Sequence, residues 1–402
     1  MPAGVYLHIP FCKSRCSYCD FATDIYRATS VVDRYIEALC KEIDAFDHTD
    51  RNPGGSEGAG FRPAGTLATG RASAKAGESR VIVDTIYFGG GTPSLLIPKQ
   101  IKQIVIAVGE KFSVDSDSEI TMEMNPATVT PESLSAYKKL GINRASFGVQ
   151  TFNDRALKLL ARGHDANDAR QTYKMLRDAG FENISFDLIA GLPGQTLEDW
   201  EKNLDEAIGM SPEHLSLYLL EIHEGKPLAE QVRSGRQPKP DDDLAARMYE
   251  TMCEMLAAAG YKQYEISNFA KPGFESRHNS KYWRLEPVYG FGVSAHSFDG
   301  YQRYSNERDT SKYVERIENF LTAEVTRERV DTASEFAFLG LRLEEGINLD
   351  EYSKRFEIDL ETAYRSDLNR LLDHGLIELD DDRLKLTQKG KLFSNEVFAV
   401  FI

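Results

Sequence analysis

The first half of the chain alternates short apolar runs with longer segments in which apolar residues recur at helical spacing. Six runs have the length and composition of β-strands, and they occupy residues 5–9, 84–88, 119–124, 144–149, 184–189 and 214–220. Helix start signals stand between them, among them Thr130 before Pro131 and a capping box from Thr196 to Asp199. Alternating strands and helices predict an α/β protein with a parallel sheet, and six such units predict a partial, TIM-like (β/α)6 barrel.

Beyond residue 220 the pattern changes twice. The aromatic and glycine-rich stretch 260–298 is expected to extend the sheet, so that residues 1–300 form one barrel domain. Helical patterns then cover 311–322, 333–343 and 360–373, followed by a predicted hairpin that turns at Asp381 and Asp382. This order predicts a C-terminal α+β, winged-helix-like domain over 301–402. Its acidic residues argue against a DNA-reading role.

Residues 51–79 interrupt the pattern between the first predicted helix and the second predicted strand. They are rich in Gly, Ala, Ser and Arg and contain almost no large apolar residue. Such a segment buries too little apolar surface to fold, so it is predicted to be a disordered insert. Its position in the chain places it on the barrel face opposite the strand ends, and we expect its deletion to leave the metal site described below intact.

The charge balance limits the classes of partner. Lys and Arg total 48 against 63 Asp and Glu, which gives a formal net charge of −15. This excess argues against nonspecific binding to nucleic acid or to anionic lipid surfaces. No run approaches the roughly 18 apolar residues that span a bilayer, and the amino terminus lacks a secretory pattern. We expect a cytoplasmic protein with no nucleic-acid partner and no transmembrane segment, and a homodimer stays open.

Three of the five cysteines, Cys12, Cys16 and Cys19, fall within eight residues after the first predicted strand. An iron–sulfur cluster normally takes four thiolates, so three thiolates leave one iron of a [4Fe–4S] cluster free to chelate a small molecule. S-adenosylmethionine is the cofactor that pairs with such centres in radical chemistry. Zinc, with His8 or Asp20 as a fourth ligand, is the alternative. The odd count argues against a disulfide.

Glycines and polar residues follow or end successive predicted strands. After the cysteines come Gly89–Pro93, then Glu123, Gln150 and Asp187. The carboxyl ends of barrel strands share one rim, where active sites are built. The recurrence of these residues at equivalent positions predicts one functional site at that rim.

Several longer motifs resemble one known family. The segment "YLHIPFCKSRCSYCDF" is similar to the signature of radical S-adenosylmethionine (SAM) enzymes related to oxygen-independent coproporphyrinogen III dehydrogenase. "FGGGTPSLL", "EMNPATV", "GVQTF", "LARGH" and "FDLIAGLPGQT" carry the same resemblance, which runs from Tyr6 to the end of the chain except for 51–79. Two features resemble the HemW haem-chaperone branch of that family. Phe21 stands where the dehydrogenases have a further cysteine, and "HNSKYW" at 278–283 is similar to the haem-associated HNxxYW motif.

The resemblance implies a radical SAM barrel, a HemN-type C-terminal domain and a set of binding residues. It implies a [4Fe–4S] cluster on the three cysteines, with S-adenosylmethionine chelated at its open iron. Contacts to S-adenosylmethionine are implied for Tyr6, Gly90, Gly91, Thr92, Glu123, Gln150, Arg162 and Asp187. Haem contacts are implied for His278, Asn279, Tyr282 and Trp283. His278 is the candidate axial ligand, with His296 and His8 as competitors. No catalytic residue is assigned.

Three functions are compatible with these residues. The first is a haem chaperone that passes haem to respiratory or other haem-accepting proteins, and Phe21 and the HNxxYW-like motif favour it. The second is oxygen-independent coproporphyrinogen III dehydrogenase, which decarboxylates propionate side chains by radical chemistry. The third is a radical enzyme that acts on an unrelated substrate and has no affinity for haem.

Overall fold

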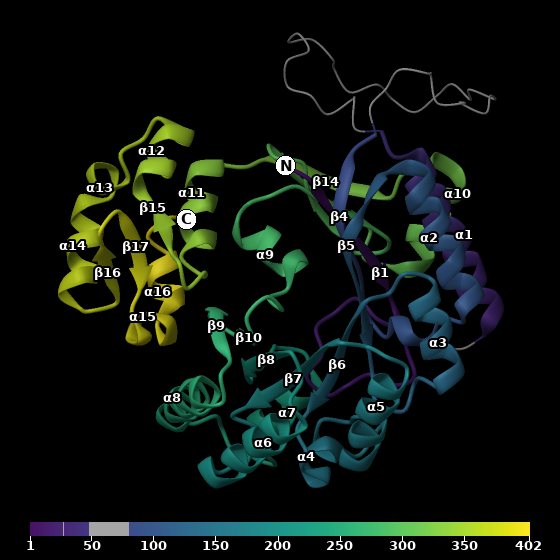
Figure 1. Cartoon of the computed structure of the whole chain (residues 1–402), viewed down its shortest axis with the longest axis horizontal. Coiled ribbons are helices and arrows are strands. Elements are labelled where there is room, and N and C mark those ends of the chain that lie inside the picture. Colours follow the sequence, from purple (N-terminus) through teal and green to yellow (C-terminus); the bar gives the residue numbers. More distant parts are fainter. Residues whose placement is uncertain (27, 48–79) are drawn as a thin grey trace.

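The centre of the protein is a curved sheet in which six parallel strands follow one another in chain order (Figure 1). The structure, a computed structural model, describes residues 1–26, 28–47 and 80–402. The six strands are β1 (Ala3–Ile9), β4 (Ile82–Gly90), β5 (Ser113–Met124), β6 (Arg144–Gln150), β7 (Asn183–Ala190) and β8 (His214–Leu219). All six predicted strands are confirmed. So is the partial barrel, since within the described residues the two edge strands of the sheet do not pair with each other.

Helices cover the convex side of this sheet, as Figure 1 shows for α1, α2, α3 and α5. The helices of the barrel are α1 (Thr29–Ala45), α2 (Pro98–Lys111), α3 (Pro131–Lys139), α4 (Asp154–Leu159), α5 (Ala166–Asp178), α6 (Leu197–Met210), α7 (Pro227–Arg233) and α8 (Asp242–Ala258). The predicted start signals are confirmed: the Thr130 side chain accepts from the N–H of Ser133, and Thr196 and Asp199 form a reciprocal capping box.

The strands separate apolar from polar side chains by alternation. In β6, Phe147 and Val149 pack into the hydrophobic core, whereas Arg144, Ser146 and Gln150 line a cavity on the concave side. Strands β7 and β8 repeat this arrangement. Because successive side chains of a strand point to opposite faces, strands β4 to β8 supply residues to both the core and the site.

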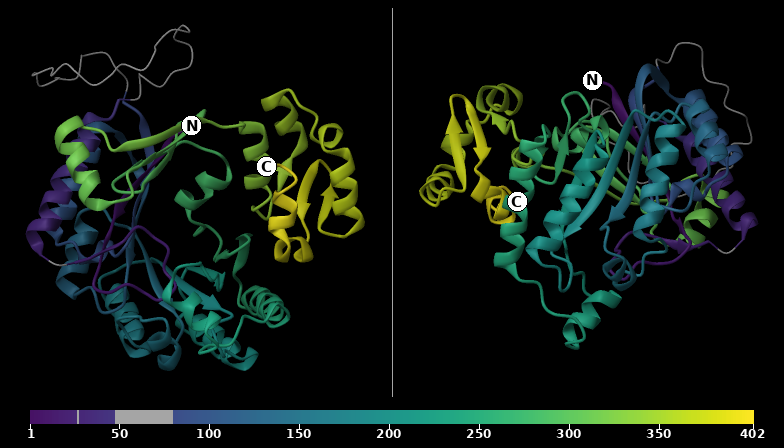
Figure 2. Two further views of the ribbon diagram at one scale, coloured as in Figure 1. Left: turned by 180° about the vertical axis from the view of Figure 1, so that it is seen from behind. Right: turned by 60° about the horizontal axis from the view of Figure 1, so that its bottom comes forward.

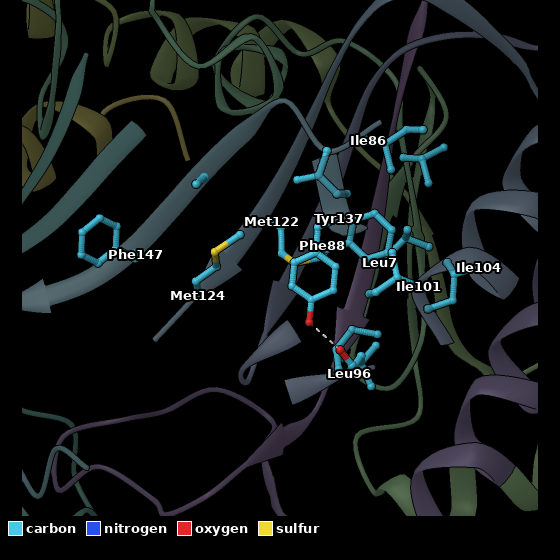
Figure 3. Packing of buried hydrophobic residues seen from close by; sticks show 14 of the residues in the cluster. Leu7, Ile86, Phe88, Leu96, Ile101, Ile104, Met122, Met124, Tyr137 and Phe147 are labelled. Carbon is cyan, nitrogen blue, oxygen red and sulfur yellow. Dashed lines mark hydrogen bonds between the residues drawn. The ribbon is translucent and has the colours of Figure 1, made fainter. Parts of the chain in front are cut away.

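The core lies between the convex face of the sheet and the helices (Figure 3). Phe88 from β4 and Ile101 and Ile104 from α2 are buried there. Tyr137 of α3 is buried with them, and its hydroxyl donates to the carbonyl of Leu96 at 2.6 Å. Burial of each such aliphatic or aromatic side chain stabilises the fold by about 1.5–3 kcal/mol relative to exposure.

The sheet is extended at both edges, as the sequence predicts for the stretch after residue 260. Beside β1 lie β11 (Val288–Phe291), β12 (His296–Phe298), β13 (Gln302–Asn306) and β14 (Glu324–Arg329), and beside β8 lie β10 (Asn268–Ala270) and β9 (Lys262–Glu265). Helix α10 (Thr310–Phe320) links β13 to β14, and helix α9 (Arg277–Trp283) links β10 to β11.

The C-terminal part has a hydrophobic cluster of its own, which includes Tyr352, Leu371 and Leu384. Its elements are α11 (Thr332–Gly340), β15 (Ile347–Asn348), α12 (Leu349–Phe356), α13 (Leu360–Ala363), α14 (Arg365–Asp373), β16 (Ile377–Asp380), β17 (Arg383–Leu386), α15 (Gln388–Leu392) and α16 (Ser394–Phe398). Both views of Figure 2 show this unit, in yellow, beside the barrel. The predicted hairpin is β16–β17, with Asp381 at its turn at φ 52°.

Residues 302–329 belong to the barrel rather than to this unit. Strands β13 and β14 pair with the main sheet, and Tyr313 and Ile317 of α10 are buried in the barrel core. We therefore propose a boundary after β14, near residue 330, in place of the one expected at 300.

Two further sequence-based expectations concern the insert at 51–79 and the absence of a transmembrane segment. The predicted insert at 51–79 lies outside the described residues. Across residues 1–26, 28–47 and 80–402, no helix combines the length and the apolar character required to cross a bilayer.

Candidate functional site

The cysteine loop, residues 12–23, lies between β1 and α1. The short strands β2 (Phe11–Cys12) and β3 (Asp24–Ile25) pair and close its base. The N–H of Ser17 donates to the carbonyl of Leu160 at 2.9 Å, and the N–H of Leu228 donates to the carbonyl of Ser17 at 2.9 Å. These contacts fix the loop against two other segments of the barrel, with its three cysteines free of disulfides and half-buried.

Two polar side chains point at the sulfur atoms. The hydroxyl of Thr92 donates to Cys12 Sγ at 3.6 Å, and Arg162 Nη1 donates to Cys16 Sγ at 3.5 Å. Burial raises the pKa of the Cys12 and Cys19 thiols. Thiolates at these positions therefore need a positive partner, such as a metal centre, to offset the cost of desolvation.

The geometry does not resemble a single-ion site. Among the described residues no three His, Cys, Asp or Glu side chains converge closely enough to hold one metal ion. A zinc site needs four ligands within about 2.0–2.3 Å of one atom, whereas the thiolates of a [4Fe–4S] cluster bind different irons. The proposed fourth zinc ligands are also engaged elsewhere: His8 bonds to Tyr6 and to the carbonyl of Ala22, and Asp20 pairs with Lys226.

A cavity of about 570 Å³ opens on the concave side of the sheet, beside the cysteine loop. We call it the central cavity. The residues predicted for the site that line it are Cys12, Cys16, Cys19, Gly90, Gly91, Glu123, Gln150, Arg162, Asp187 and Asn279. They come from seven different segments of the chain, and the fold brings them together at one place. Its volume is suited to one small-molecule ligand.

Glu123 is a half-buried carboxyl group that lines the central cavity. Its two oxygens accept from the Tyr87 hydroxyl at 2.8 Å and from the N–H of Gly90 at 3.1 Å. Burial raises the pKa of Glu123 to about 7, although both hydrogen bonds oppose this shift. A carboxyl group that titrates near neutrality can bind a cationic group in its ionised form.

The glycines after β4 are required by close backbone approach. Gly90 has φ 107°, and a Cβ atom there would lie 2.7 Å from the His8 ring. A Cβ atom on Gly91 would lie 2.7 Å from the backbone of Pro10. No other residue fits this turn without displacing the strand that leads into the cysteine loop.

Arg162, Gln150 and Asp187 also line the central cavity. Arg162 Nη2 donates to Asn125 Oδ1 at 2.5 Å and to the carbonyl of Gly148 at 2.8 Å, while its buried Nε has no partner among the described residues. Gln150 ends β6 at φ 67°. Burial raises the pKa of Asp187, and Ser216 and nearby arginines oppose the shift.

Arg144 is a further residue of this site, and the sequence alone did not single it out. Its side chain is buried and lines the central cavity, with its Nε unpartnered among the described residues. The signal that could have found it is alternation, since Arg144, Ser146, Gly148 and Gln150 occupy every second position of β6.

Two residues predicted to contact S-adenosylmethionine do not line the central cavity. Thr92 is buried and holds Cys12 and Asn125 through its hydroxyl. The Tyr6 ring stacks on Tyr87, which lines the cavity, at 6.1 Å, and the Tyr6 hydroxyl bonds to His8 at 3.0 Å. In this arrangement both residues support the residues that line the cavity.

The HNxxYW-like motif forms helix α9, and His278 faces the barrel. The His278 side chain is only 1% exposed. Its Nδ1 bonds to Thr85 Oγ1 at 2.9 Å and its Nε2 to the Tyr282 hydroxyl at 3.2 Å, and its ring stacks on Tyr87 at 5.0 Å. Burial lowers the pKa of His278 to about 3. Iron coordination by His278 stays a prediction, and it requires at least one of these hydrogen bonds to break.

The rest of the motif faces two directions. Asn279 lines the central cavity, whereas Trp283 lies under the Arg342 guanidinium at 4.3 Å, at the C-terminal unit. Helix α9 therefore contacts both the central cavity and the C-terminal unit. Of the competing histidines, His8 is buried and His296 is exposed on β12.

The residues present fit a [4Fe–4S] cluster and S-adenosylmethionine. Three thiols on one anchored loop supply the sulfur donors, and the adjoining cavity offers carboxyl groups, an amide and a guanidinium. The unpartnered Nε of Arg162 and Arg144 are donors without an acceptor among the described residues, as expected beside an anionic or polar ligand.

Comparison with known proteins bears on the whole chain. A radical SAM superfamily model matches residues 6–207, and a HemN C-terminal domain model matches residues 328–393. The heme chaperone HemW of Bacillus subtilis is 36% identical over 99% of both chains. The heme chaperone HemW of Escherichia coli is 32% identical over 100% of this chain and 98% of its own. The solved structure of coproporphyrinogen III oxidase (HemN) from Escherichia coli has a TM-score of 0.81 at 24% identity, covers 100% of this chain and 90% of its own, and shows the shared fold.

Proposed function

Because this chain belongs to the radical SAM superfamily and, within it, to the HemW family, we propose that it is a haem chaperone. It holds a [4Fe–4S] cluster and S-adenosylmethionine at the central cavity, binds haem and passes it to acceptor proteins, respiratory ones among them. The observation that carries the cofactor assignment is the placement of Cys12, Cys16 and Cys19 on one loop at a cavity that also holds Glu123 and Arg162.

The cavity residues have distinct parts in this proposal. When bound, the cluster would supply an iron for the amino-acid end of S-adenosylmethionine to chelate, and an electron for reductive chemistry. Gly90 and Gly91 let the backbone approach the ligand closely, and ionised Glu123 accepts from its amino group. Arg162 meets its carboxylate through a charge-assisted hydrogen bond. Gln150 and Asp187 accept from the ribose hydroxyls.

The main rival is coproporphyrinogen III dehydrogenase. Its support is the shared fold, because the similarity to the solved HemN structure lies at 24% identity. Phe21 stands against it, since this position carries a cysteine in the dehydrogenase pattern. Phe21 is 68% exposed within the cysteine loop and provides no thiol.

One anaerobic preparation tests the proposal. The chain is reconstituted with iron and sulfide, titrated with haem, and then mixed with haem-depleted respiratory membrane vesicles. We expect a Soret band that saturates at about one haem per chain and then moves to the vesicle fraction. The same preparation is incubated with coproporphyrinogen III, S-adenosylmethionine and a reductant. Absence of haem binding contradicts the proposal, and multiple turnovers to protoporphyrinogen IX favour the dehydrogenase.

A further inference from the structure

The loop after β8 brings a different histidine, His223, to the central cavity. Of the described histidines, His223 is the one that lines this cavity. Its side chain is 42% exposed. Its nearest polar partner among the described residues is Glu221, with Nε2 and Oε2 3.8 Å apart, which is too long for a hydrogen bond. The imidazole is therefore accessible, in contrast to that of His278.

This loop is anchored beside the cysteine loop. Lys226 Nζ pairs with Asp20 Oδ1 at 2.8 Å, and the N–H of Leu228 donates to the carbonyl of Ser17. A turn closed by the N–H of Lys226 and the carbonyl of His223, at 3.3 Å, lies between these contacts and the cavity. We call the cysteine loop and residues 218–223 together the mouth of the central cavity.

Exposed aromatic side chains stand at this mouth. Phe21 and Tyr218 are both exposed and both line the central cavity. Large apolar side chains are normally withdrawn from water, and their grouping at the opening of a cavity marks a ligand surface. Their rings offer a flat surface of the kind on which a planar aromatic ligand stacks.

Cationic side chains lie on the other side of Phe21. A second, polar hollow of about 320 Å³ shares Cys19, Phe21 and Thr23 with the central cavity. Its walls carry Arg15, Lys226 and Arg308, with Asp24 and Asp309 as the carboxylates.

The two arginines of this hollow are mostly exposed and have only distant carboxylate partners. Arg308 lies 3.6 Å from Asp20, and Arg15 lies 3.7 Å from Asp24. Each also donates to a backbone carbonyl, of Asp20 and Thr23 respectively. Exposed pairs of this length contribute little to stability, so a carboxylate ligand can compete for both guanidinium groups.

We propose that haem docks at this mouth, with its macrocycle against Phe21, its iron bound by His223 and its propionates paired with Arg308 and Arg15. A neutral imidazole is a common axial ligand of haem iron, and arginine pairs well with carboxylates. This inference rests on the proposed chaperone function and specifies its haem site. The central cavity accommodates one small-molecule ligand, so S-adenosylmethionine occupies it while the porphyrin lies outside, at the opening.

Haem titration of the cluster-loaded full chain tests the ligand assignment. His223→Ala is compared with the unaltered chain and with His296→Ala, which removes another exposed histidine. We expect His223→Ala to shift the Soret band and to weaken haem binding at least tenfold, while His296→Ala stays within about twofold. Unchanged spectrum and affinity in His223→Ala overturn the inference, as does a loss confined to His296→Ala. If the unaltered chain binds no haem, the chaperone function itself fails.

A second titration tests the propionate contacts independently of the iron ligand. Arg308→Ala is titrated with haem and with haem dimethyl ester, whose propionates carry no charge. We expect affinity for haem to fall at least fivefold and affinity for the ester to stay within twofold of the unaltered chain. Equal losses for both ligands, or none for either, contradict the assignment. Iron and sulfide content and circular dichroism are measured on each variant to confirm cluster loading and folding.

Discussion

Helix α9 and the loop after β8 each bring a histidine to the concave side of the sheet, yet they hold it differently. His278 is enclosed by Thr85, Tyr87 and Tyr282, and both ring nitrogens are hydrogen-bonded. His223 is half-exposed at the mouth, and its ring nitrogens lie beyond hydrogen-bond distance of Glu221. A histidine with both nitrogens bonded in a buried site contributes to stability, whereas an accessible imidazole is available for a ligand. A sequence motif does not distinguish these roles.

The largest effect is expected from a substitution in the cysteine loop, which forms part of the mouth where the accessible His223 lies. Cys16→Ser removes one of three sulfur donors, so the variant should lose essentially all visible cluster absorbance after anaerobic reconstitution. Its near-ultraviolet circular dichroism should be retained, because the half-exposed thiol contributes little to the core. Cys253→Ala, at another half-buried cysteine, is the matched control and should load normally. Full cluster loading of Cys16→Ser would remove the basis of the cofactor assignment.

The variant His278→Ala tests whether the buried histidine contributes to the stability of the fold. This change leaves the hydroxyls of Thr85 and Tyr282 without their partner and opens a cavity beside Tyr87, so unfolding free energy should fall by about 2–3 kcal/mol. His278→Gln keeps a side chain with both a donor and an acceptor and should recover part of the loss. His223→Ala should change stability by less than about 0.5 kcal/mol, as expected for a half-exposed side chain. Urea unfolding of the three variants measures these changes in the free energy of unfolding. Similar decreases for His278→Ala and His223→Ala would contradict the different roles assigned to the two histidines.

A smaller effect is expected from pH at Glu123, whose pKa burial raises to about 7. The ionised carboxylate accepts a hydrogen bond from the amino group of S-adenosylmethionine, so affinity should increase by roughly tenfold between about pH 6 and pH 8. Glu123→Gln should abolish this slope, and Glu221→Gln at the mouth should retain it. Anaerobic equilibrium dialysis measures both. A slope that persists in Glu123→Gln assigns the titration to another group.

The same carboxyl group links folding to pH. Between its ordinary value of 4.5 and about 7, the folded chain binds a proton at Glu123 that the unfolded chain releases. The contribution of Glu123 to the free energy of unfolding therefore decreases as pH rises through this interval. Stability measurements on Glu123→Gln should lack that decrease.

Local signals were enough to predict much of the barrel. The six strands follow from short apolar runs, and the Thr196–Asp199 capping box marks the start of α6 from four adjacent residues. The convergence of Glu123, Gln150 and Asp187 follows from a general property of parallel sheets rather than from any one of them. These features depend on neighbours in sequence or on the repeating geometry of the fold.

Features that depend on packing between residues far apart in the sequence could not be predicted from such local signals. The assignment of β13 and β14 to the barrel depends on pairing with a sheet whose other strands lie far away in sequence. Burial of His278 depends on Thr85, 193 residues away. Arg144 resembles an ordinary strand residue until the curved sheet closes around its guanidinium. The availability of His223 likewise depends on the anchoring of its loop by Asp20 and Ser17.

The alternation along β6 has a consequence for how this protein tolerates change. Deletion of one residue near the start of the strand would exchange the two faces, and Phe147 and Val149 would enter the cavity while Ser146 and Gln150 entered the core. Point substitutions at the positions that face the cavity, by contrast, alter which ligand it binds and leave the hydrophobic core unchanged. Single substitutions at these positions can therefore change the ligand specificity of the cavity, whereas insertions and deletions are tolerated only in the connections between strands.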